Sequence, residues 1–467
     1  MNSKVRVRIA PSPTGFVHIG LARTALFNYF FAKKNKGDFV LRIEDTDKER
    51  SKKEFEEDII NNLKWLGLNW DEFYRQSDRV DIYKKYIEQL LKSGKAFWCL
   101  HTEEELEQES ERQYTAKEAP RHICEHKRKN LKPESGQSGV IRLAVDSNAD
   151  NAIIFNDIVR GKIKFDSKLL GDFSIAKSPE EPLYHMSVVV DDYEMKISHV
   201  IRGEEHLANT PKHILIQEAL GFDTPAYVHL PLILNKDRSK LSKRHGAVSV
   251  GEFRGQGYLP EAIINYLGLL GFTPKGDREV LSFAELTGEF ELERIHKAGA
   301  IFDYQKLDWL NGEYIKKMNP QNFAERLFDF MEGQGIESGR KSVENIVSLV
   351  QTRLRKLSDI KDFDYLFKEP EFDKNLLKWK GEDIGKSFDA LREVLVIVEK
   401  SGVDDMSRLR DMLNGLSENI GGKGLVFWPF RVAITGKESS PDPVEVAKVI
   451  GKEKTIARVK KALNFEK

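Results

Sequence analysis

Hydrophobic residues near the start of the chain first alternate with charged ones and then change to a helical spacing. In residues 5–9, valine and isoleucine alternate with arginine, a period of two that predicts a strand. Two prolines and a glycine in residues 11–15 predict an irregular loop, and apolar residues from Gly20 onward recur at helical intervals. Residues 39–43 predict a second strand. This strand–helix–strand order is typical of a parallel sheet covered by helices.

An insertion interrupts the α/β pattern. Residues 96–183 contain both cysteines, a highly charged helix and a stretch with glycine and serine. After them, apolar segments at residues 187–190 and 197–201 predict two further strands, and a helix is predicted from about Pro211. We therefore expect the two halves of one sheet to flank an inserted domain.

The last third of the chain has a different pattern. Strand signals fade beyond about residue 320, and residues 342–354 have the spacing of a helix. Residues 443–450 predict another helix, because Asp442 is a favoured N-cap and Pro443 suits the first helical position. We expect this region to be mainly helical.

Composition narrows the class of protein. The 467 residues exceed one ordinary core, so two to four domains are expected. The two cysteines argue against a disulfide framework and suit a reducing compartment. The apolar runs are too short to span a bilayer and the N-terminus lacks the apolar core of a secretory signal, so we expect a cytoplasmic protein without membrane contact. Because 74 basic and 74 acidic side chains balance, any nucleic-acid surface must come from local patches.

The first loop carries a pattern that fits phosphate binding. His18-Ile19-Gly20 stands where a strand–loop–helix unit places a helix N-terminus, whose amides and dipole favour negative charge. Gly20 lets a flat nucleotide approach the backbone, and His18 can donate a hydrogen bond to a phosphate. Taken alone, the pattern is more often that of a surface loop with a capping glycine.

A second loop carries two lysines three residues apart, in the run Lys240-Leu241-Ser242-Lys243-Arg244. Two ammonium groups suit a triphosphate, because phosphoryl chemistry is served mainly by positioning and charge neutralisation. Taken alone, this run also describes a solvated basic turn.

Charged residues cluster at predicted strand ends, where ligands bind in open α/β sheets. An acidic amino acid such as glutamate requires arginine forks for its carboxylates and an acid for its amine. Arg8, Arg202 and Glu44 supply that set. Ordinary salt bridges at the strand ends are the alternative interpretation.

Both cysteines belong to a repeated Cys-x-His pattern, Cys99-Leu100-His101 and Cys124-Glu125-His126. In an extended segment, residues two apart point to the same side, so each pair can present two ligands to one ion. Two thiolates and two imidazoles suit tetrahedral Zn²⁺. Between the pairs, the run from Thr102 to Glu105 predicts a capping box that begins a short helix. Coincidence is the alternative, since His122 lies nearby as well.

Together these motifs resemble those of glutamyl-tRNA synthetases, class I aminoacyl-tRNA synthetases with a Rossmann-type catalytic core. The run from Arg8 to Leu26 is similar to the first family motif, with Leu21 in place of its last histidine. Lys240 to Gly246 resembles the Lys-Leu-Ser-Lys-Arg form of the second motif. Similar segments near Trp309 and Trp428 extend the resemblance over essentially the whole chain.

The resemblance implies ATP-dependent ligation of L-glutamate to tRNA(Glu) through a glutamyl-adenylate, with ATP and Mg²⁺ as a substrate complex. It implies catalytic roles for His18, Gly20, Lys240 and Lys243. It implies that glutamate is bound by Arg8, Ser12, Glu44, Tyr184 and Arg202, and ATP by His18, Gly20, Glu205 and Lys243. It also implies a structural Zn²⁺ at Cys99, His101, Cys124 and His126.

The expected fold class is α/β: a Rossmann-type parallel-sheet core, an inserted α+β acceptor-binding domain and an all-α anticodon-binding region. The predicted parts are the first half of the core (1–95), the inserted acceptor-stem domain (96–183), the second half of the core (184–235), a stem-contact region with the lysine loop (236–320) and the helical anticodon-binding region (321–467). We expect a monomer.

Other functions stay open on the sequence. The enzyme can be non-discriminating and also charge tRNA(Gln), or the chain can be a non-catalytic tRNA-binding protein. Retention of His18, Lys240 and Lys243 argues against the second. Glutaminyl-tRNA synthetases resemble the chain less, because their anticodon region is a β-barrel, and a glutamyl-queuosine-forming enzyme lacks the C-terminal half.

Overall fold

The computed structural model describes residues 4–129, 131–135, 137–146, 152–239, 241, 248–276, 278–401 and 403–466. The chain forms two compact units, Met1–Gly255 with Pro260–Leu307 and Gln256–Leu259 with Asp308–Lys467. Within the described ranges, no helix has both the length and the apolar character needed to cross a membrane.

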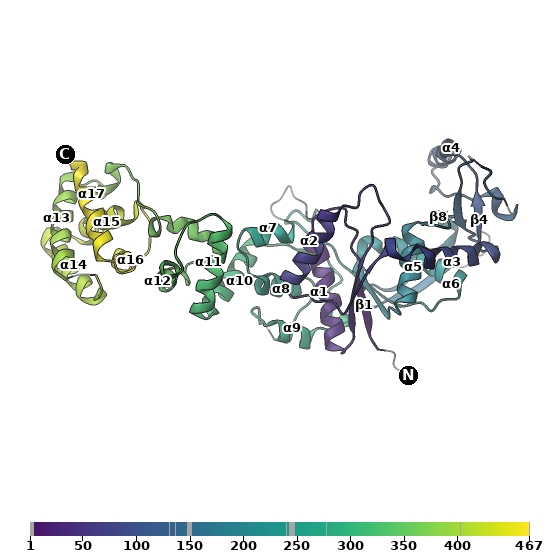
Figure 1. Cartoon of the computed structure of the whole chain (residues 1–467), viewed down its shortest axis with the longest axis horizontal. Helices are drawn as coiled ribbons and strands as arrows, with labels where there is room; N and C mark the ends of the chain where they lie inside the picture. The colour runs from purple at the N-terminus through teal and green to yellow at the C-terminus, as the bar shows by residue number, and fades with distance from the viewer. Residues whose placement is uncertain are drawn as a thin grey trace. The chain divides into compact units, whose positions relative to one another are not determined.

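The N-terminal unit begins with three parallel strands in the order β1 (Arg6–Ile9), β2 (Asp38–Ile43) and β3 (Glu72–Arg75). Helices α1 (Ile19–Lys34) and α2 (Lys53–Trp65) connect them and are labelled in Figure 1. The predicted strand, loop, helix and second strand are confirmed. The apolar residues of β1 and β2 are buried, whereas Phe73 and Tyr74 of β3 are half-buried.

The second half of the sheet consists of β10 (His199–Gly203) and β11 (Ala226–Leu230), which are parallel. Helices α5 (Tyr184–Glu194) and α6 (Thr210–Leu220) accompany them. Ser198, just before β10, joins the halves: its N–H donates to the carbonyl oxygen of Arg6 at 2.9 Å, and its hydroxyl oxygen accepts from the Arg6 N–H at 2.9 Å. The two halves of the core therefore meet at β1 and β10.

The predicted strand at residues 187–190 is wrong, because these residues lie in α5. Tyr184 accordingly opens a helix and does not precede a strand. Residues 186–192 are all buried, so the helix lacks the polar face that gives an amphipathic helix its period. Three consecutive valines in such a run match a buried strand equally well, and periodicity alone does not separate the two.

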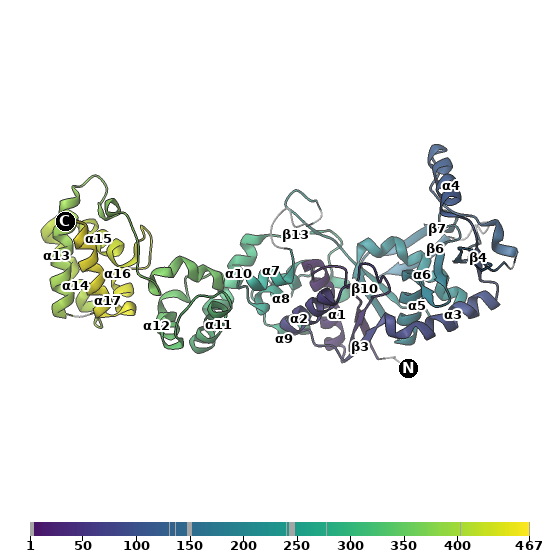
Figure 2. The same cartoon turned by 45° about the horizontal axis from the view of Figure 1, so that its top comes forward.

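The inserted segment contains an antiparallel sheet in the order β4 (Ala96–Cys99), β5 (Val140–Leu143), β8 (Ser174–Ser178) and β9 (Glu181–Pro182). A hairpin of β6 (Ala152–Asp157) and β7 (Gly161–Asp166) pairs with β11. Helix α3 (Val80–Lys92) packs with α5 and α6, and the three lie side by side in Figure 2. Helix α4 (Glu103–Thr115) begins at the predicted capping box of Thr102 and Glu105.

The rest of this unit contains α7 (Val250–Gly255), α8 (Pro260–Leu269), α9 (Phe283–Glu289) and the short parallel pair β12 (Ile233–Leu234) and β13 (Ala300–Ile301). Helices α8 and α9 pack against α1. Aromatic edges fix α1 here: the ring centroids of Phe27 and Phe290 lie 5.0 Å apart, and those of Phe30 and Phe283 lie 5.5 Å apart. This packing holds the helix whose N-terminus enters the site described below. Helix α10 (Tyr304–Lys317) begins in this unit and ends in the other.

The C-terminal unit confirms the predicted helical region. It contains α11 (Pro320–Gly333), α12 (Arg340–Val350), α13 (Ile384–Ser401), α14 (Met406–Ile420), α15 (Lys423–Thr435), α16 (Pro443–Ile450) and α17 (Lys452–Leu463). Helix α16 has the predicted bounds, and the Asp442 carboxylate accepts from the Val444 N–H at 2.9 Å. The last five of these helices gather into one bundle in Figure 1.

Replacing Leu391 by alanine should destabilise the C-terminal unit. Leu391 is fully buried on α13, which packs against α14, α15 and α17. The cavity left behind should lower the free energy of unfolding by about 2–5 kcal/mol. Urea unfolding can be followed through Trp379 and Trp428, whose rings lie 5.3 Å apart in this unit. Val396→Ala on the same helix is the matched control, since Val396 is 40% exposed. Equal loss in both variants would contradict the assigned core.

Candidate active site

A cavity of about 560 Å³ opens in the N-terminal unit. Its lining comes from β1 and the loop after it, the start of α1, the end of β2, the start of α5 and the end of β10. Among the lining residues are all the predicted glutamate contacts and the described members of the predicted ATP set: Arg8, Ser12, His18, Gly20, Glu44, Tyr184, Arg202 and Glu205. Residues as far apart in the sequence as Arg8 and Glu205, which are 197 positions apart, therefore line one cavity. The carboxyl ends of parallel strands lie at the same edge of a sheet, which brings such residues together.

The first motif forms the N-terminus of α1. His18 is the N-cap, and its Nδ1 accepts from the Leu21 N–H at 3.2 Å. Because this bond uses the Nδ1 lone pair, neutral His18 carries its proton on Nε2, where it can be donated to a ligand. A Cβ on Gly20 would lie 3.0 Å from His18 Nδ1, so the missing side chain lets the ring lie against the helix.

Described residues within and after the second motif lie beside the first motif. Lys240 and Lys243 fall outside the described residues, but Leu241 and Val248 are described and both line the cavity. The Leu241 N–H donates to the Ile233 carbonyl at 3.2 Å, and the Ile19 N–H donates to the Val248 carbonyl at 2.9 Å. The segment after the lysine run is therefore bonded to the start of α1, as convergence of the two motifs requires.

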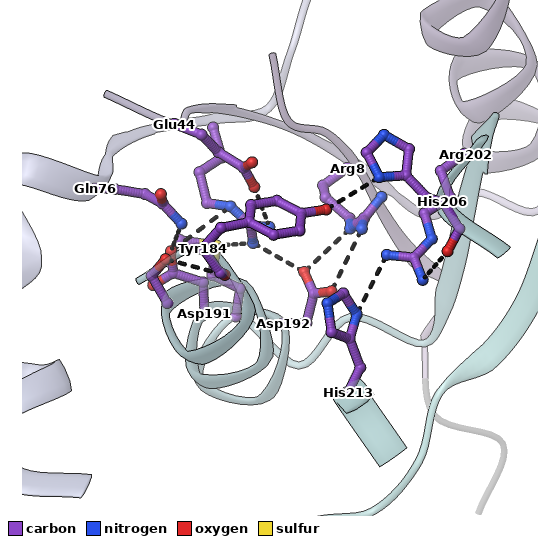
Figure 3. Close-up of polar contacts among 12 residues, drawn as sticks. Arg8, Glu44, Gln76, Tyr184, Asp191, Asp192, Arg202, His206 and His213 are labelled. Carbon is purple, nitrogen blue, oxygen red and sulfur yellow. Dashed lines mark hydrogen bonds and ion pairs between the residues drawn. The ribbon is translucent and has the colours of Figure 1, made fainter. Parts of the chain in front are cut away.

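Buried ion pairs position Arg8 and Glu44 (Figure 3). Asp192 on α5 accepts from Arg8 Nε at 3.0 Å and from Arg42 Nη1 at 2.8 Å. Arg42 Nη2 also donates to Glu44 at 3.1 Å. Burial raises the pKa of the Glu44 carboxyl, although Arg42 beside it works in the opposite direction. The site thus contains a carboxylate whose charge a ligand ammonium would stabilise.

Arg202 is held differently. Its guanidinium is buried and donates to neutral groups: Nε to His229 Nε2 at 3.2 Å, Nη2 to Thr210 Oγ1 at 2.9 Å, and Nη1 to His213 Nδ1 at 3.2 Å. Burial lowers the pKa of His213 well below its ordinary value, so that ring stays an uncharged acceptor. In the described part of the chain, no carboxylate forms an ion pair with Arg202. A buried positive charge without a charged partner favours binding of an anion.

A buried aspartate sets the tautomer of His229. Asp157 accepts from His229 Nδ1 at 2.7 Å, which leaves the Nε2 lone pair for Arg202. The same carboxylate accepts from the backbone N–H groups of His229, Val159 and Arg160 at 3.0, 3.0 and 2.7 Å. Although burial alone would raise it, these bonds lower the pKa of Asp157 below its ordinary value.

Several side chains of this site were missed by sequence reasoning. Arg8 and Arg202 are held by four of them, Asp192, His213, His229 and, through His229, Asp157. A fifth, His206, forms a hydrogen bond of 3.2 Å with the Tyr184 hydroxyl through its Nδ1. Burial raises the pKa of Tyr184 to about 12, so its hydroxyl stays protonated. Most of these residues lie within helices or strands, where the sequence offers no local sign of a ligand.

The four predicted metal ligands also come together. Ligand atoms of Cys99, His101, Cys124 and His126 all lie within 4.8 Å of one another, and both cysteines are buried. His101 Nδ1 lies 3.4 Å from Cys99 Sγ and 3.6 Å from Cys124 Sγ. Bonds of about 2.3 Å to sulfur and about 2.0 Å to nitrogen would place tetrahedral ligands about 3.5 Å apart. The two sulfurs and His101 Nδ1 therefore fit a zinc ion.

Comparison with known proteins agrees with this geometry. Residues 4–309 match the family described as tRNA synthetases class I (E and Q), catalytic domain, and residues 322–463 match an anticodon binding domain. A glutamate–tRNA ligase of Thermoanaerobacter pseudethanolicus is 43% identical, over 99% of this chain and 98% of the relative. The chain belongs to the glutamate–tRNA ligase family. Among other family members, that of Aquifex aeolicus is 42% identical, over 99% of both chains.

A solved structure of another family member has the same fold as this chain. The crystal structure of a glutamate tRNA ligase from Elizabethkingia meningosepticum in complex with its amino acid has a TM-score of 0.88. Its sequence identity is 35%, and the match covers 100% of both chains. The Rossmann-type core and the helical C-terminal region predicted from the sequence are thereby confirmed.

Replacing Asp157 by asparagine should destabilise this synthetase. Each carboxylate oxygen accepts two N–H groups, so an amide NH₂ in place of either oxygen would face two donors. We expect a loss of about 1–3 kcal/mol, measured by denaturant unfolding. Because the folded pKa of Asp157 is lowered, the loss should be present above its ordinary pKa and should shrink as pH falls through the folded pKa.

Asp166→Asn at the end of β7 is the control for that substitution. Asp166 is exposed, and its side chain caps the Lys168 N–H, a role that asparagine also fills. Asp166→Asn should leave the unfolding midpoint nearly unchanged. Equal stability of both variants at neutral pH would contradict the buried role of Asp157.

Proposed function

We propose that this chain ligates L-glutamate to tRNA(Glu) in two steps. In the first, an α-carboxylate oxygen of glutamate attacks the α-phosphorus of ATP, forming glutamyl-adenylate and releasing pyrophosphate. In the second, the 2′-hydroxyl of the terminal tRNA adenosine attacks the activated carbonyl, and AMP leaves. The observation that carries this proposal is that Arg202 and the N-terminus of α1 line the same cavity.

Glutamate has charged groups that match the charged side chains of the cavity. Arg202 would bind its side-chain carboxylate, and Glu44 its ammonium group, with Arg8, Ser12 and Tyr184 completing the contacts. Glutamine would be disfavoured, because a neutral amide leaves the buried Arg202 guanidinium without a charged partner.

ATP is the second substrate and enters with Mg²⁺, which supplies charge neutralisation on its phosphates. His18 Nε2, the amides at the start of α1 and Gly20 would hold ATP at the helix N-terminus. Glu205 lines the same cavity and would contact ATP. Lys240 and Lys243 would add positive charge to the developing pyrophosphate. The chain's own part in catalysis is positioning and charge stabilisation, and no covalent enzyme intermediate is needed.

The C-terminal helices would bind the anticodon arm of the tRNA, in line with the match of residues 322–463. Arg355 is exposed there, whereas Arg353 already pairs with Glu445 at 2.9 Å. Arg355 is therefore the better phosphate contact of the two. Such contacts make affinity fall with salt.

A structural zinc ion between the two Cys-x-His pairs is part of this proposal. Two thiolates and an imidazole at the measured separations suit Zn²⁺, and thiolates of this kind persist in a reducing compartment. We accordingly place the protein in the cytoplasm, and we expect it to act as a monomer with one cavity for each tRNA.

ATP–pyrophosphate exchange with and without tRNA tests the activity. We expect glutamate-dependent exchange that is stimulated by tRNA(Glu), followed by charging of that tRNA. Assays with purified tRNA(Glu) and tRNA(Gln) show how strictly the anticodon is read. No exchange under either condition would contradict the proposed function and favour a tRNA-binding protein without catalysis.

Replacing Arg202 by alanine should weaken glutamate binding selectively. A buried charge-assisted contact contributes about 3 kcal/mol or more, so its loss should raise the KM for glutamate at least 100-fold. The KM for ATP should change less than about threefold. Preference for glutamate over glutamine should fall as well. Arg278→Ala is the control, because Arg278 is exposed and pairs with Glu285 and Glu289. Unchanged glutamate KM in Arg202→Ala would refute the role of this residue.

A further inference from the structure

A third histidine lies against the cluster of thiols and imidazoles. His122 Nε2 is 3.6 Å from Cys99 Sγ, a distance typical of two ligands of one tetrahedral ion. Its ring centroid lies 5.0 Å from that of His101, with the two planes at 81°. The side chain is only 12% exposed.

The backbone of His122 is fixed independently of any ion. Its carbonyl oxygen accepts from the Asp172 N–H at 2.6 Å. Gly171 has a φ of +59°, and a Cβ there would lie 2.7 Å from the same carbonyl oxygen. A glycine is therefore needed where the chain passes His122, and the imidazole is preorganised beside the thiols.

A carboxylate decides which nitrogen of His122 is protonated. His122 Nδ1 lies 2.5 Å from Glu109 Oε2 on α4. An ionised carboxylate only accepts hydrogen bonds, so Nδ1 carries the proton and the lone pair is on Nε2, facing Cys99. A carboxylate behind a histidine in this way is the common arrangement that orients a metal-binding imidazole.

His126, the fourth member of the predicted set, has the opposite arrangement. The Leu100 backbone N–H donates to His126 Nδ1 at 3.2 Å. A main-chain N–H can only donate, so this bond occupies the Nδ1 lone pair, and the neutral ring carries its proton on Nε2. Neither nitrogen then offers a lone pair to an ion. The ring instead stacks on His101, with centroids 4.3 Å apart and an interplanar angle of 25°.

We propose that the zinc ion is held by Cys99, Cys124, His101 and His122, that Glu109 orients His122, and that His126 supports the site from outside. This assignment rests on the proposed zinc site and changes its fourth ligand. Binding would replace the two thiol protons, so two thiolates and two neutral imidazoles would balance the charge of Zn²⁺.

The ligands would connect three parts of the inserted segment. Cys99 ends β4, His101 precedes α4, and His122 and Cys124 lie in the segment that returns from α4. Glu109 lies on α4, and its bond to His122 would connect that helix to the site as well. The buried cluster of Phe97, Cys99 and Cys124 is small, so a metal would supply cohesion that apolar packing provides elsewhere.

Metal binding by the full-length protein tests the assignment. The protein is stripped with a chelator, and zinc affinity is measured by competition with a chromophoric chelator. Cobalt substitution reports ligand geometry through its visible absorption. His122→Ala and His126→Ala are the matched pair. We expect His122→Ala to lower zinc affinity at least 100-fold and to change the cobalt spectrum, and His126→Ala to change affinity less than fivefold.

Two further variants separate ligand loss from misfolding. Glu109→Gln keeps the shape of the side chain and should lower affinity about 10-fold, as loss of an orienting partner does. His122→Cys supplies another zinc ligand and should recover affinity relative to His122→Ala. Circular dichroism of each variant controls for folding, so a folded His122→Ala that fails to bind zinc supports the assignment.

The outcomes distinguish this inference from the zinc proposal beneath it. Loss of affinity in His126→Ala, with His122→Ala unaffected or equally affected, would overturn the assignment and leave the zinc site standing. A wild-type protein that binds neither zinc nor cobalt would overturn both.

Discussion

The carboxylate of Asp192 is the contact on which the arrangement of the cavity depends. It lies on α5, in the second half of the core, and accepts from Arg8 on β1 and Arg42 on β2, in the first half. Arg42 is completely buried, so its charge has to be matched by protein groups. Removing Asp192 would take away the carboxylate that Arg8 and Arg42 share. The geometry that places Arg8 and Glu44 at the cavity is thus fixed by electrostatics as well as by the sheet.

Three arginines around this contact are paired with carboxylates. Arg42 and Arg79 both approach Asp191, at 3.6 and 2.7 Å, while Arg8 pairs with Asp192 and Glu44 pairs with Arg42. Three arginines are therefore matched by three carboxylates. Arg202 stands apart, because its measured partners are imidazoles, a hydroxyl and a carbonyl. Glutamate has a net charge of minus one at neutral pH, and under the proposed function its side chain would supply a carboxylate to Arg202.

The sequence predicted those residues of the cavity that belong to a recognisable local pattern. Arg8, Glu44 and Arg202 stand at strand ends, and the two loops have distinctive motifs, so their positions could be predicted. Asp192 and His213 could not, because they lie inside helices whose register against the sheet depends on tertiary packing. The same packing hid α5 itself, since a helix buried on every side loses its period.

The Cys-x-His pairs show the same limit at the level of single atoms. Spacing identified the thiols and their neighbouring histidines, and those residues do come together. Spacing is silent on which ring nitrogen has a lone pair, because that depends on the second hydrogen bond of each ring.

Backbone hydrogen bonds join the segment after the lysine run to the start of α1. The Ile19 N–H donates to Val248, and the Val250 N–H donates to Val17 at 2.8 Å, so the segment after the lysine run pairs with residues on both sides of His18. A short antiparallel bridge of His18 and Ser249 lies between these bonds. Because His18 also caps α1, any displacement of this bridge would move the helix N-terminus that is proposed to hold phosphate. The start of α1 and residues 248–250 are therefore held together by backbone hydrogen bonds, so the two segments are positioned jointly.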